Sequence, residues 1–223
     1  FVGTRYNRED WQEVWRVYAG LVRLLDHCVG EIVARLKAQG IYDDTLILFT
    51  SDHGEMLGAH AMFQKMCMYE ESIRTPLILK SPAGIGIRPE PVSHIDVLPT
   101  LCDLLDMPAP YDLPGQSLRK AQAPRDIFVQ YDGNGALGNF SRSVIRGADK
   151  LIVDIFKAEM FFELHNLDAD PLEDRNLITE RPDLAATLLA SLCDHMRKTG
   201  DPLRLTPDDL TRFLTARAAL LPI

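Results

Sequence analysis

Hydrophobic residues recur at helical spacing over the first forty residues, which predicts one long amphipathic helix. Asn7 precedes the repeat as a cap, Glu9 and Asp10 fall in the first turn, and Gly40 ends the pattern. The apolar stripe is wide, so we expect this helix to pack against a sheet. The stripe consists of Trp11, Val14, Trp15, Tyr18, Leu21, Val22, Leu25, Val29, Ile32, Val33 and Leu36.

The next run, residues 45–50, is apolar on both faces, as in a central strand of a parallel sheet. Asp52 and His53 follow directly, at the end of a strand where open α/β sheets gather their ligands. A carboxylate and an imidazole are both donors to a divalent metal, so this pair is a candidate metal site. Asp52 with Glu55 fits a helix capping box equally well, and His53 alone would fit a core histidine.

Two further side chains follow within fifteen residues of the strand end, His60 and Lys65. The ammonium of Lys65 can return to the same pocket and neutralise negative charge on a substrate. His60 is either a proton donor in the pocket wall or an ordinary loop residue. A metal together with a lysine indicates a charged ester as the substrate.

The last third of the chain changes from long periodic segments to short strands joined by turns, which predicts a small antiparallel sheet. We place a domain boundary after residue 118, with an α/β domain in 1–118 and an α+β lobe in 119–223. Residues 131–140 form either a wide hairpin or a substrate-facing loop, in which Asn134 would bind substrate; Arg142 is a candidate second anion contact. Predicted strands are 126–130, 141–146, 150–156 and 160–164, and predicted helices are 93–105 (capped by Asp96), 182–198 and 207–221.

Composition narrows the class of protein. The chain has 223 residues, 46% of them hydrophobic, and a net charge of −8, which fits a globular protein and argues against a nucleic-acid partner. No apolar run approaches the ~20 residues needed to cross a bilayer, so we expect no membrane contact. The four cysteines lie far apart, which predicts buried free thiols and favours a reducing compartment such as the cytoplasm.

Several ordered motifs resemble the sulfatase family of the alkaline-phosphatase superfamily. They are T-S-D-H-G at 50–54, G-A-H at 58–60, Lys65, and Y-E-x-x-x-R-x-P-L-I at 69–78. The resemblance implies part of an alkaline-phosphatase-like α/β sheet flanked by helices, followed by a small α+β lobe with an antiparallel sheet. It also implies a metal held by Asp52 and His53, with calcium first and manganese, magnesium or zinc as alternatives, and catalytic roles for Lys65 and His60.

The family carries its nucleophile in C-x-P-x-R or S-x-P-x-R, where the first residue is oxidised to formylglycine, and this chain lacks that motif. The chain begins at Phe1 without a leader pattern, so we expect an internal piece: the C-terminal portion of a sulfatase, with formylglycine only in the N-terminal half. Alone it should be inactive, bind metal weakly and self-associate through exposed sheet surface. The intact enzyme would hydrolyse a sulfate ester of a small molecule or sugar. The alternatives are a fragment of a phosphonate monoester or phosphodiester hydrolase, and a non-catalytic sulfatase-like module.

Overall fold

The computed structural model describes residues 6–82, 86–87, 90–119, 124–133, 138–157 and 159–220. The chain forms two compact units whose segments alternate along the sequence. The first unit consists of Phe1–Lys65, Glu71–Pro89 and Leu101–Pro108, and the second of Met66–Glu70, Glu90–Thr100 and Ala109–Ile223. The two-domain division after residue 118 stays a prediction.

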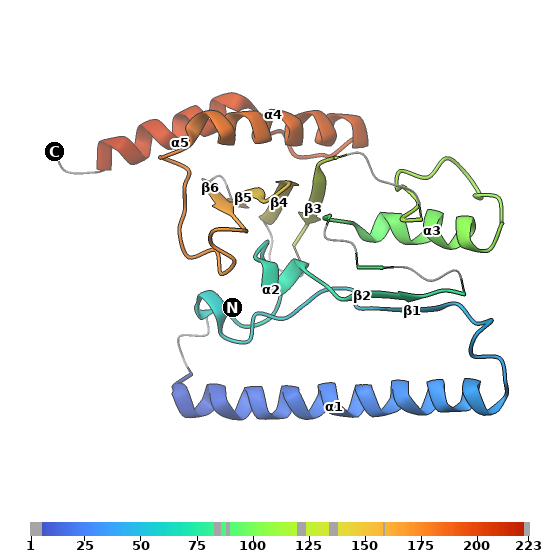
Figure 1. Cartoon of the computed structure of the whole chain (residues 1–223). Helices are drawn as coiled ribbons and strands as arrows, with labels where there is room; N and C mark the ends of the chain where they lie inside the picture. The colour runs from blue at the N-terminus through green and yellow to red at the C-terminus, as the bar shows by residue number, and fades with distance from the viewer. Residues whose placement is uncertain are drawn as a thin grey trace. The chain divides into compact units, whose positions relative to one another are not determined.

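The predicted N-terminal helix is confirmed as α1 (Arg8–Ala38), drawn in blue in Figure 1. Asn7 Oδ1 accepts the backbone N–H groups of Glu9 at 2.8 Å and Asp10 at 3.0 Å, and the Asp10 carboxylate accepts the Asn7 N–H at 2.9 Å. This reciprocal pair satisfies amides that have no partner inside the helix. Gly40 adopts a left-handed φ of 70° just beyond the helix end.

The expectation that the apolar stripe of α1 packs on a sheet is not met by full burial, since five of its eleven residues are half-buried and the others are exposed. No residue of this helix is buried among the described residues, and Leu21 and Ile32 are each 60% exposed. The reason is length: a helix of 31 residues spans about 46 Å, whereas strands of four residues span about 13 Å. The two strands of the same unit are too short to cover it.

The strand before the candidate site is β1 (Ile47–Thr50), and its partner is β2 (Leu77–Lys80). They pair antiparallel, with Ile47 opposite Lys80 and Thr50 opposite Leu77, which corrects the expectation of parallel neighbours. Between them the only α-helix is the single turn α2 (Glu70–Ile73), whereas the crossover between parallel neighbours usually contains a full helix. Within the described residues, β1 has no second strand partner.

Asp96 takes part in the predicted cap, but as the third residue of a capping box in which Ser93 is the N-cap. It ends a 3-10 turn, His94–Asp96, that precedes α3 (Val97–Leu104). Its buried carboxylate accepts the backbone N–H groups of Ser93 and Gln116, each at 2.9 Å. The same carboxylate therefore links the start of this turn, at Ser93, to the segment that contains Gln116.

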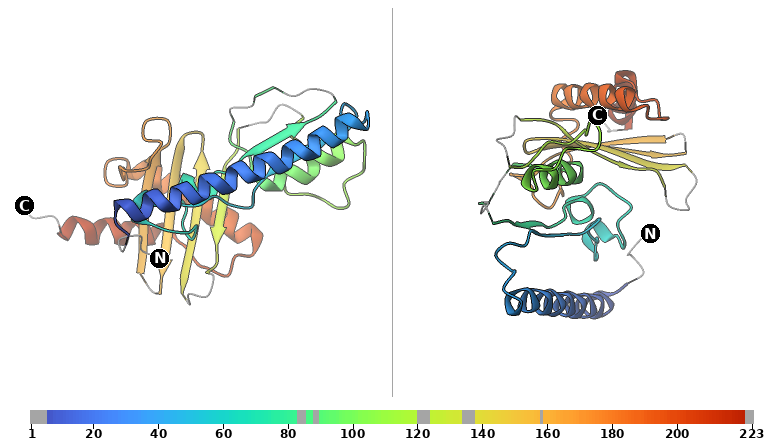
Figure 2. Two further views of the ribbon diagram at one scale, coloured as in Figure 1. Left: turned by 90° about the horizontal axis from the view of Figure 1, so that it is seen from below. Right: turned by 90° about the vertical axis from the view of Figure 1, so that its right-hand side faces the viewer.

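The predicted C-terminal sheet is confirmed in full as four antiparallel strands in the order β3-β4-β5-β6. Helices α4 and α5 cover one face of it, as the edge-on view in Figure 2 shows. The core between sheet and helices includes Val144, Leu151, Val153, Phe162, Leu164, Leu188, Leu189 and Leu192. The elements are β3 (Ile127–Tyr131), β4 (Asn139–Arg146), β5 (Asp149–Phe156), β6 (Glu159–Asn166), α4 (Pro182–Thr199) and α5 (Pro207–Leu220).

The opposite face of this sheet carries buried charge, because successive residues of a strand point to opposite sides. Lys150 is fully buried, and its Nζ lies 2.7 Å from Glu173 Oε1 and 3.0 Å from Glu70 Oε1. Glu173 Oε2 also accepts the backbone N–H of Glu70 at 2.7 Å. Two carboxylates therefore share one ammonium, and together they hold the short segment Met66–Glu70 in the second unit.

The four cysteines are free thiols, as predicted, but the expectation that they are buried holds only for Cys67. No helix in the described part of the chain is both long enough and apolar enough to cross a membrane.

We expect Lys150→Met to destabilise the second unit by about 3–5 kcal/mol, because it leaves Glu173 buried without a counter-charge. Thermal and urea unfolding followed by circular dichroism measure the change. Arg197→Met is the matched control: Arg197 is exposed and pairs with exposed Asp194, so its effect should stay within about 0.5 kcal/mol. Equal effects of the two substitutions would contradict a structural role for the buried ammonium.

Candidate metal and anion site

The candidate site begins where β1 ends, in an exposed segment of the first unit. The Asp52 side chain is 84% exposed and that of His53 is 40% exposed, and Asp52 Oδ2 lies 3.5 Å from His53 Nε2. Asp52 Oδ1 accepts the backbone N–H of His53 at 2.9 Å. This hydrogen bond first, then the charge of the imidazole and, more weakly, that of Lys65, hold the pKa of the Asp52 carboxyl below its ordinary 3.8.

The orientation of the His53 ring is set by its neighbour. Nδ1 lies 2.8 Å from the Gly54 carbonyl oxygen, which can only accept, so Nδ1 carries the proton in this contact. In the neutral ring the lone pair is then on Nε2, on the side of Asp52. A carboxylate oxygen and an imidazole nitrogen on one exposed edge are a suitable pair of donors for a divalent cation.

The donor set is incomplete within the described residues, where no group of three or more His, Cys, Asp or Glu side chains comes together as a metal site would require. Asp52 and His53 therefore fit two positions of a coordination shell. The remaining ligands would have to be water, substrate or another polypeptide segment.

Gly54 fixes the position of this pair against α2. Its N–H donates to the Ser72 carbonyl oxygen at 2.7 Å, and a Cβ at this position would lie 1.9 Å from the Glu71 carbonyl oxygen. No other residue has room for such an approach. The requirement for glycine directly after Asp52 and His53 is thus a packing requirement.

The chain from Glu55 to Gln64 closes into a loop through its own hydrogen bonds. The Met56 N–H donates to the Gln64 carbonyl oxygen at 3.0 Å, and Glu55 Oε1 accepts the Gln64 N–H at 2.5 Å. Leu57 and Gln64 have φ values of 45° and 76°, and such left-handed conformations cost energy for residues other than glycine. The loop is held in this shape by Glu55 and by the burial of Met56.

Both predicted catalytic residues belong to this loop or follow it. His60 is in a 3-10 turn, Ala59–Ala61, with a left-handed φ of 51°. Lys65 comes directly after Gln64, and its carbonyl oxygen accepts the Ser72 hydroxyl at 2.6 Å, so the same α2 segment anchors both sides of the loop. The structure thus brings Asp52, His53, His60 and Lys65 into one unit.

Neither of the two predicted substrate contacts is among the described residues of the first unit. Asn134 lies outside the described residues. Arg142 is a buried residue of the second unit and forms a two-point ion pair with Asp201, at 2.7 and 3.0 Å. Its other N–H groups contact Asp132 at 2.6 Å and the carbonyl oxygens of Tyr131 and Ser141. All five donors of this guanidinium are therefore engaged within the chain.

The helix-cap interpretation of Asp52 is wrong, because the residues after it form a loop and not a helix. Glu55, considered only as part of that cap, instead closes the loop that carries His60. The sequence pattern also gave no sign of the left-handed backbone angles in this loop, or of the contact between Gly54 and the Glu71 carbonyl oxygen. No spacing signal distinguishes a loop closed by a glutamate from a capped helix.

Comparisons with known proteins agree over most of the chain. A model of the sulfatase family matches residues 2–107, and a model described as N-sulphoglucosamine sulphohydrolase, C-terminal, matches residues 58–199. An uncharacterized sulfatase of Escherichia coli (strain K12), YidJ, is 33% identical over 190 residues, which cover 81% of this chain and 37% of the relative.

Two solved structures with a similar fold extend this comparison. The protein BT4656, solved in complex with its substrate D-glucosamine-2-N,6-O-disulfate, has a TM-score of 0.75 at 28% identity, covering 86% of this chain and 42% of its own. The phosphonate monoester hydrolase of Agrobacterium radiobacter has a TM-score of 0.74 at 27% identity, covering 85% and 43%. The chain thus spans about two fifths of the length of these proteins.

We expect Gly54→Ala to destabilise the first unit by about 1–3 kcal/mol, because the added methyl group would overlap the Glu71 carbonyl oxygen. Gly20→Ala is the control: Gly20 lies inside α1, a Cβ there would meet nothing within 4 Å, and alanine should stabilise the helix by roughly 0.5–1 kcal/mol. Thermal unfolding of the two variants measures both changes. Stability changes of the same sign would refute the close approach at Gly54.

Proposed function

Because this chain belongs to the sulfatase family, we propose that it forms the C-terminal part of a metal-dependent hydrolase of sulfate esters. The observation that carries the proposal is the exposed pair Asp52 and His53 at the carboxyl end of β1, with donor atoms 3.5 Å apart and the imidazole lone pair on the same side. The sulfatase relative and the neighbour solved with a sulfated glucosamine support the choice of a sulfate ester. A sulfated small molecule or sugar is the substrate class.

In this proposal Asp52 and His53 hold a divalent metal, with calcium first and manganese, magnesium or zinc as alternatives. When bound, the metal supplies positive charge that polarises the ester and balances negative charge at the reacting group. Asp52 is suited to the task because its exposed carboxylate is directed by the hydrogen bond from the His53 N–H, which also holds its pKa below the ordinary value. His53 contributes through Nε2, since Nδ1 is engaged by Gly54.

The other site residues act on the anionic part of the substrate. The Lys65 ammonium binds the sulfuryl oxygens, where a compact charge is most effective as negative charge builds up. His60 donates a proton to the leaving oxygen. Asn134 orients the substrate, and Arg142 contacts the anion only if the half-exposed Asp132 moves aside. The covalent nucleophile, a formylglycine, would come from a polypeptide segment outside this chain.

A phosphonate monoester or phosphodiester hydrolase is the second candidate. It is supported by the similarity to the phosphonate monoester hydrolase of Agrobacterium radiobacter, which is as extensive as the similarity to the neighbour with a sulfated sugar. Charge and geometry at Asp52, His53 and Lys65 suit both kinds of ester. A third candidate, a non-catalytic sulfatase-like module, is supported by the incomplete donor set in the described residues.

The 223-residue chain should bind a divalent metal with a Kd on the order of 1 mM, about −4 kcal/mol, since it offers only two ligands. Calorimetric titration with Ca²⁺ and Mn²⁺ measures this affinity. Asp52→Asn and His53→Ala should each weaken binding at least about tenfold, or 1.4 kcal/mol. Asp44→Asn, an exposed aspartate before β1, is the charge-matched control and should have no effect. If both site variants still bind the metal with unchanged affinity, the metal binds at other residues of the chain.

Hydrolysis separates the three candidates. The purified 223-residue chain should not turn over an aryl sulfate, whereas the polypeptide as its natural source produces it should, with a higher kcat/KM for the sulfate than for a phosphonate monoester. Lys65→Met should lower that kcat/KM by about 10²–10³, the usual loss when one stabilising charge is removed. Preference for the phosphonate would establish the second candidate. Absence of both activities from the natural polypeptide would favour the non-catalytic module.

A further inference from the structure

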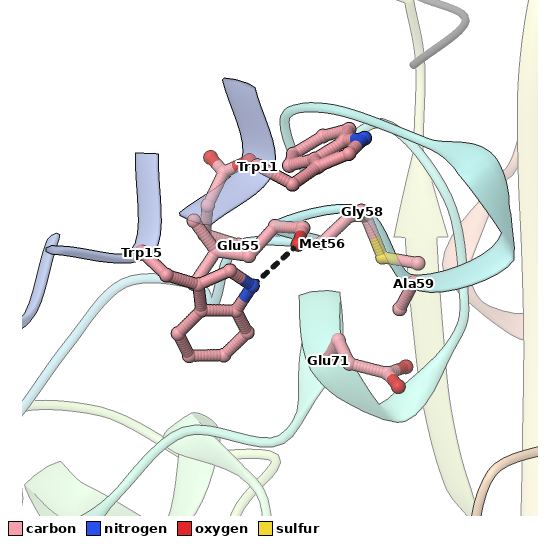
Figure 3. Close-up of a pocket in the computed structure, with 8 residues that line it drawn as sticks. Trp11, Trp15, Glu55, Met56, Gly58, Ala59 and Glu71 are labelled. Atoms are coloured by element: carbon pink, nitrogen blue, oxygen red, sulfur yellow. Dashed lines mark hydrogen bonds between the residues drawn. The ribbon is translucent and has the colours of Figure 1, made fainter. Parts of the chain in front are cut away.

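The loop that carries His60 lies beside α1 in the first unit, and a pocket of about 490 Å³ separates part of the two elements (Figure 3). Trp11 and Trp15 of the helix and residues 55–59 of the loop line this pocket. Because of this space, the loop does not rest on the helix along its whole length. Its position therefore depends on the individual contacts that cross from α1.

The first of these contacts is a hydrogen bond from Trp15. Its indole N–H donates to the Leu57 carbonyl oxygen at 3.1 Å, the contact drawn as a dashed line in Figure 3. Leu57 has a left-handed φ of 45°, which is unfavourable for a residue with a side chain. A relaxed φ would turn the Leu57 carbonyl group away from the indole. The hydrogen bond therefore favours the strained conformation over the relaxed ones.

The second contact is made by the ring of Trp11. Gly58, with a left-handed φ of 99°, is the N-cap of the 3-10 turn that contains His60. A Cβ on Gly58 would lie 3.1–3.2 Å from three carbon atoms of the Trp11 ring, so the ring lies directly against the glycine. The same ring has its centroid 6.1 Å from that of Phe63, later in the loop. Helix α1 thus contacts the loop on both sides of His60.

We propose that Trp15 is a positioning residue, whose N–H holds the loop in the conformation that keeps His60 in place. The indole acts through the Leu57 carbonyl oxygen and the turn that follows it. Without this N–H, Leu57 relaxes and the turn with His60 moves. As a role in hydrolysis the inference rests on the proposed function, whereas the role in loop conformation does not.

Hydrogen exchange of the 223-residue chain, followed by NMR, tests the loop conformation without any activity. Trp15→Phe keeps an aromatic ring and removes the N–H. The amides of Met56 and Gly58, which are hydrogen-bonded within the loop, should then exchange about tenfold faster, equivalent to 1.4 kcal/mol. The paired amides of β1 and β2, in the same unit, should keep their rates. Unchanged loop rates, or an equal rise in the strands, would overturn the proposal.

Two further variants separate the N–H from the size of the ring. Replacement of Trp15 by benzothienylalanine exchanges the N–H for a sulfur atom and keeps both fused rings, so it should reproduce the faster exchange even if Trp15→Phe does not fold. Tyr18→Phe is the control: it removes a polar group from the same helix at a residue that does not line the pocket. Faster loop exchange in the control, or none with the isostere, would contradict the assignment.

The polypeptide as its natural source produces it tests the role in hydrolysis. Trp15→Phe should lower kcat for an aryl sulfate by about tenfold and change KM by less than about twofold, because a displaced proton donor affects the chemical step. In a His60→Ala background the same substitution should have no further effect. An equal loss in both backgrounds would show that Trp15 does not act through His60. If the wild-type polypeptide has no such activity, the proposed function fails, and hydrogen exchange alone decides the role of Trp15.

Discussion

The close approach between Gly54 and α2 is the constraint on which the site depends. The Glu71 carbonyl oxygen occupies the space of a missing Cβ, and the Gly54 N–H donates to Ser72. Ser72 also donates its hydroxyl to the carbonyl of Lys65. One short helical turn therefore holds both the end of the segment with Asp52 and the start of the segment with Lys65. The roles proposed for the Asp52 carboxylate and the Lys65 ammonium would need a fixed separation between them, and this shared anchor would provide it.

The loop between these two points stores conformational strain. Leu57, His60, Ala61 and Gln64 all adopt left-handed backbone angles, which cost residues with a side chain of order 1–3 kcal/mol each. The loop compensates with the Glu55 bond and with buried Met56. Strained backbone conformations of this kind persist only when many surrounding contacts hold them, and they are common at functional sites. His60, the proposed proton donor, is one of the residues with such a backbone angle.

Charge burial distinguishes the second unit from the first. Its sheet has an apolar face under α4 and α5 and a charged face on which Lys150 is shared by Glu70 and Glu173. A buried ion pair adds little net stability, but it tolerates few alternative arrangements. It therefore fixes where the segment ending at Glu70 lies. In the first unit, by contrast, α1 contributes no fully buried residue among those described, and more than half of its apolar stripe is exposed.

The sequence by itself determined which elements form. The helical spacing of hydrophobic residues and the capping residue Asn7 predicted α1. Short apolar runs joined by turn residues predicted the four-stranded sheet, and the ordered motifs around Asp52 predicted the family. These features are local, so each short segment carries its own evidence. Only the tertiary structure decided the antiparallel pairing of β1, the hydrogen bond between Asp96 and Gln116, and the closure of the loop by Glu55. Each of these joins residues whose separation along the chain no local pattern encodes.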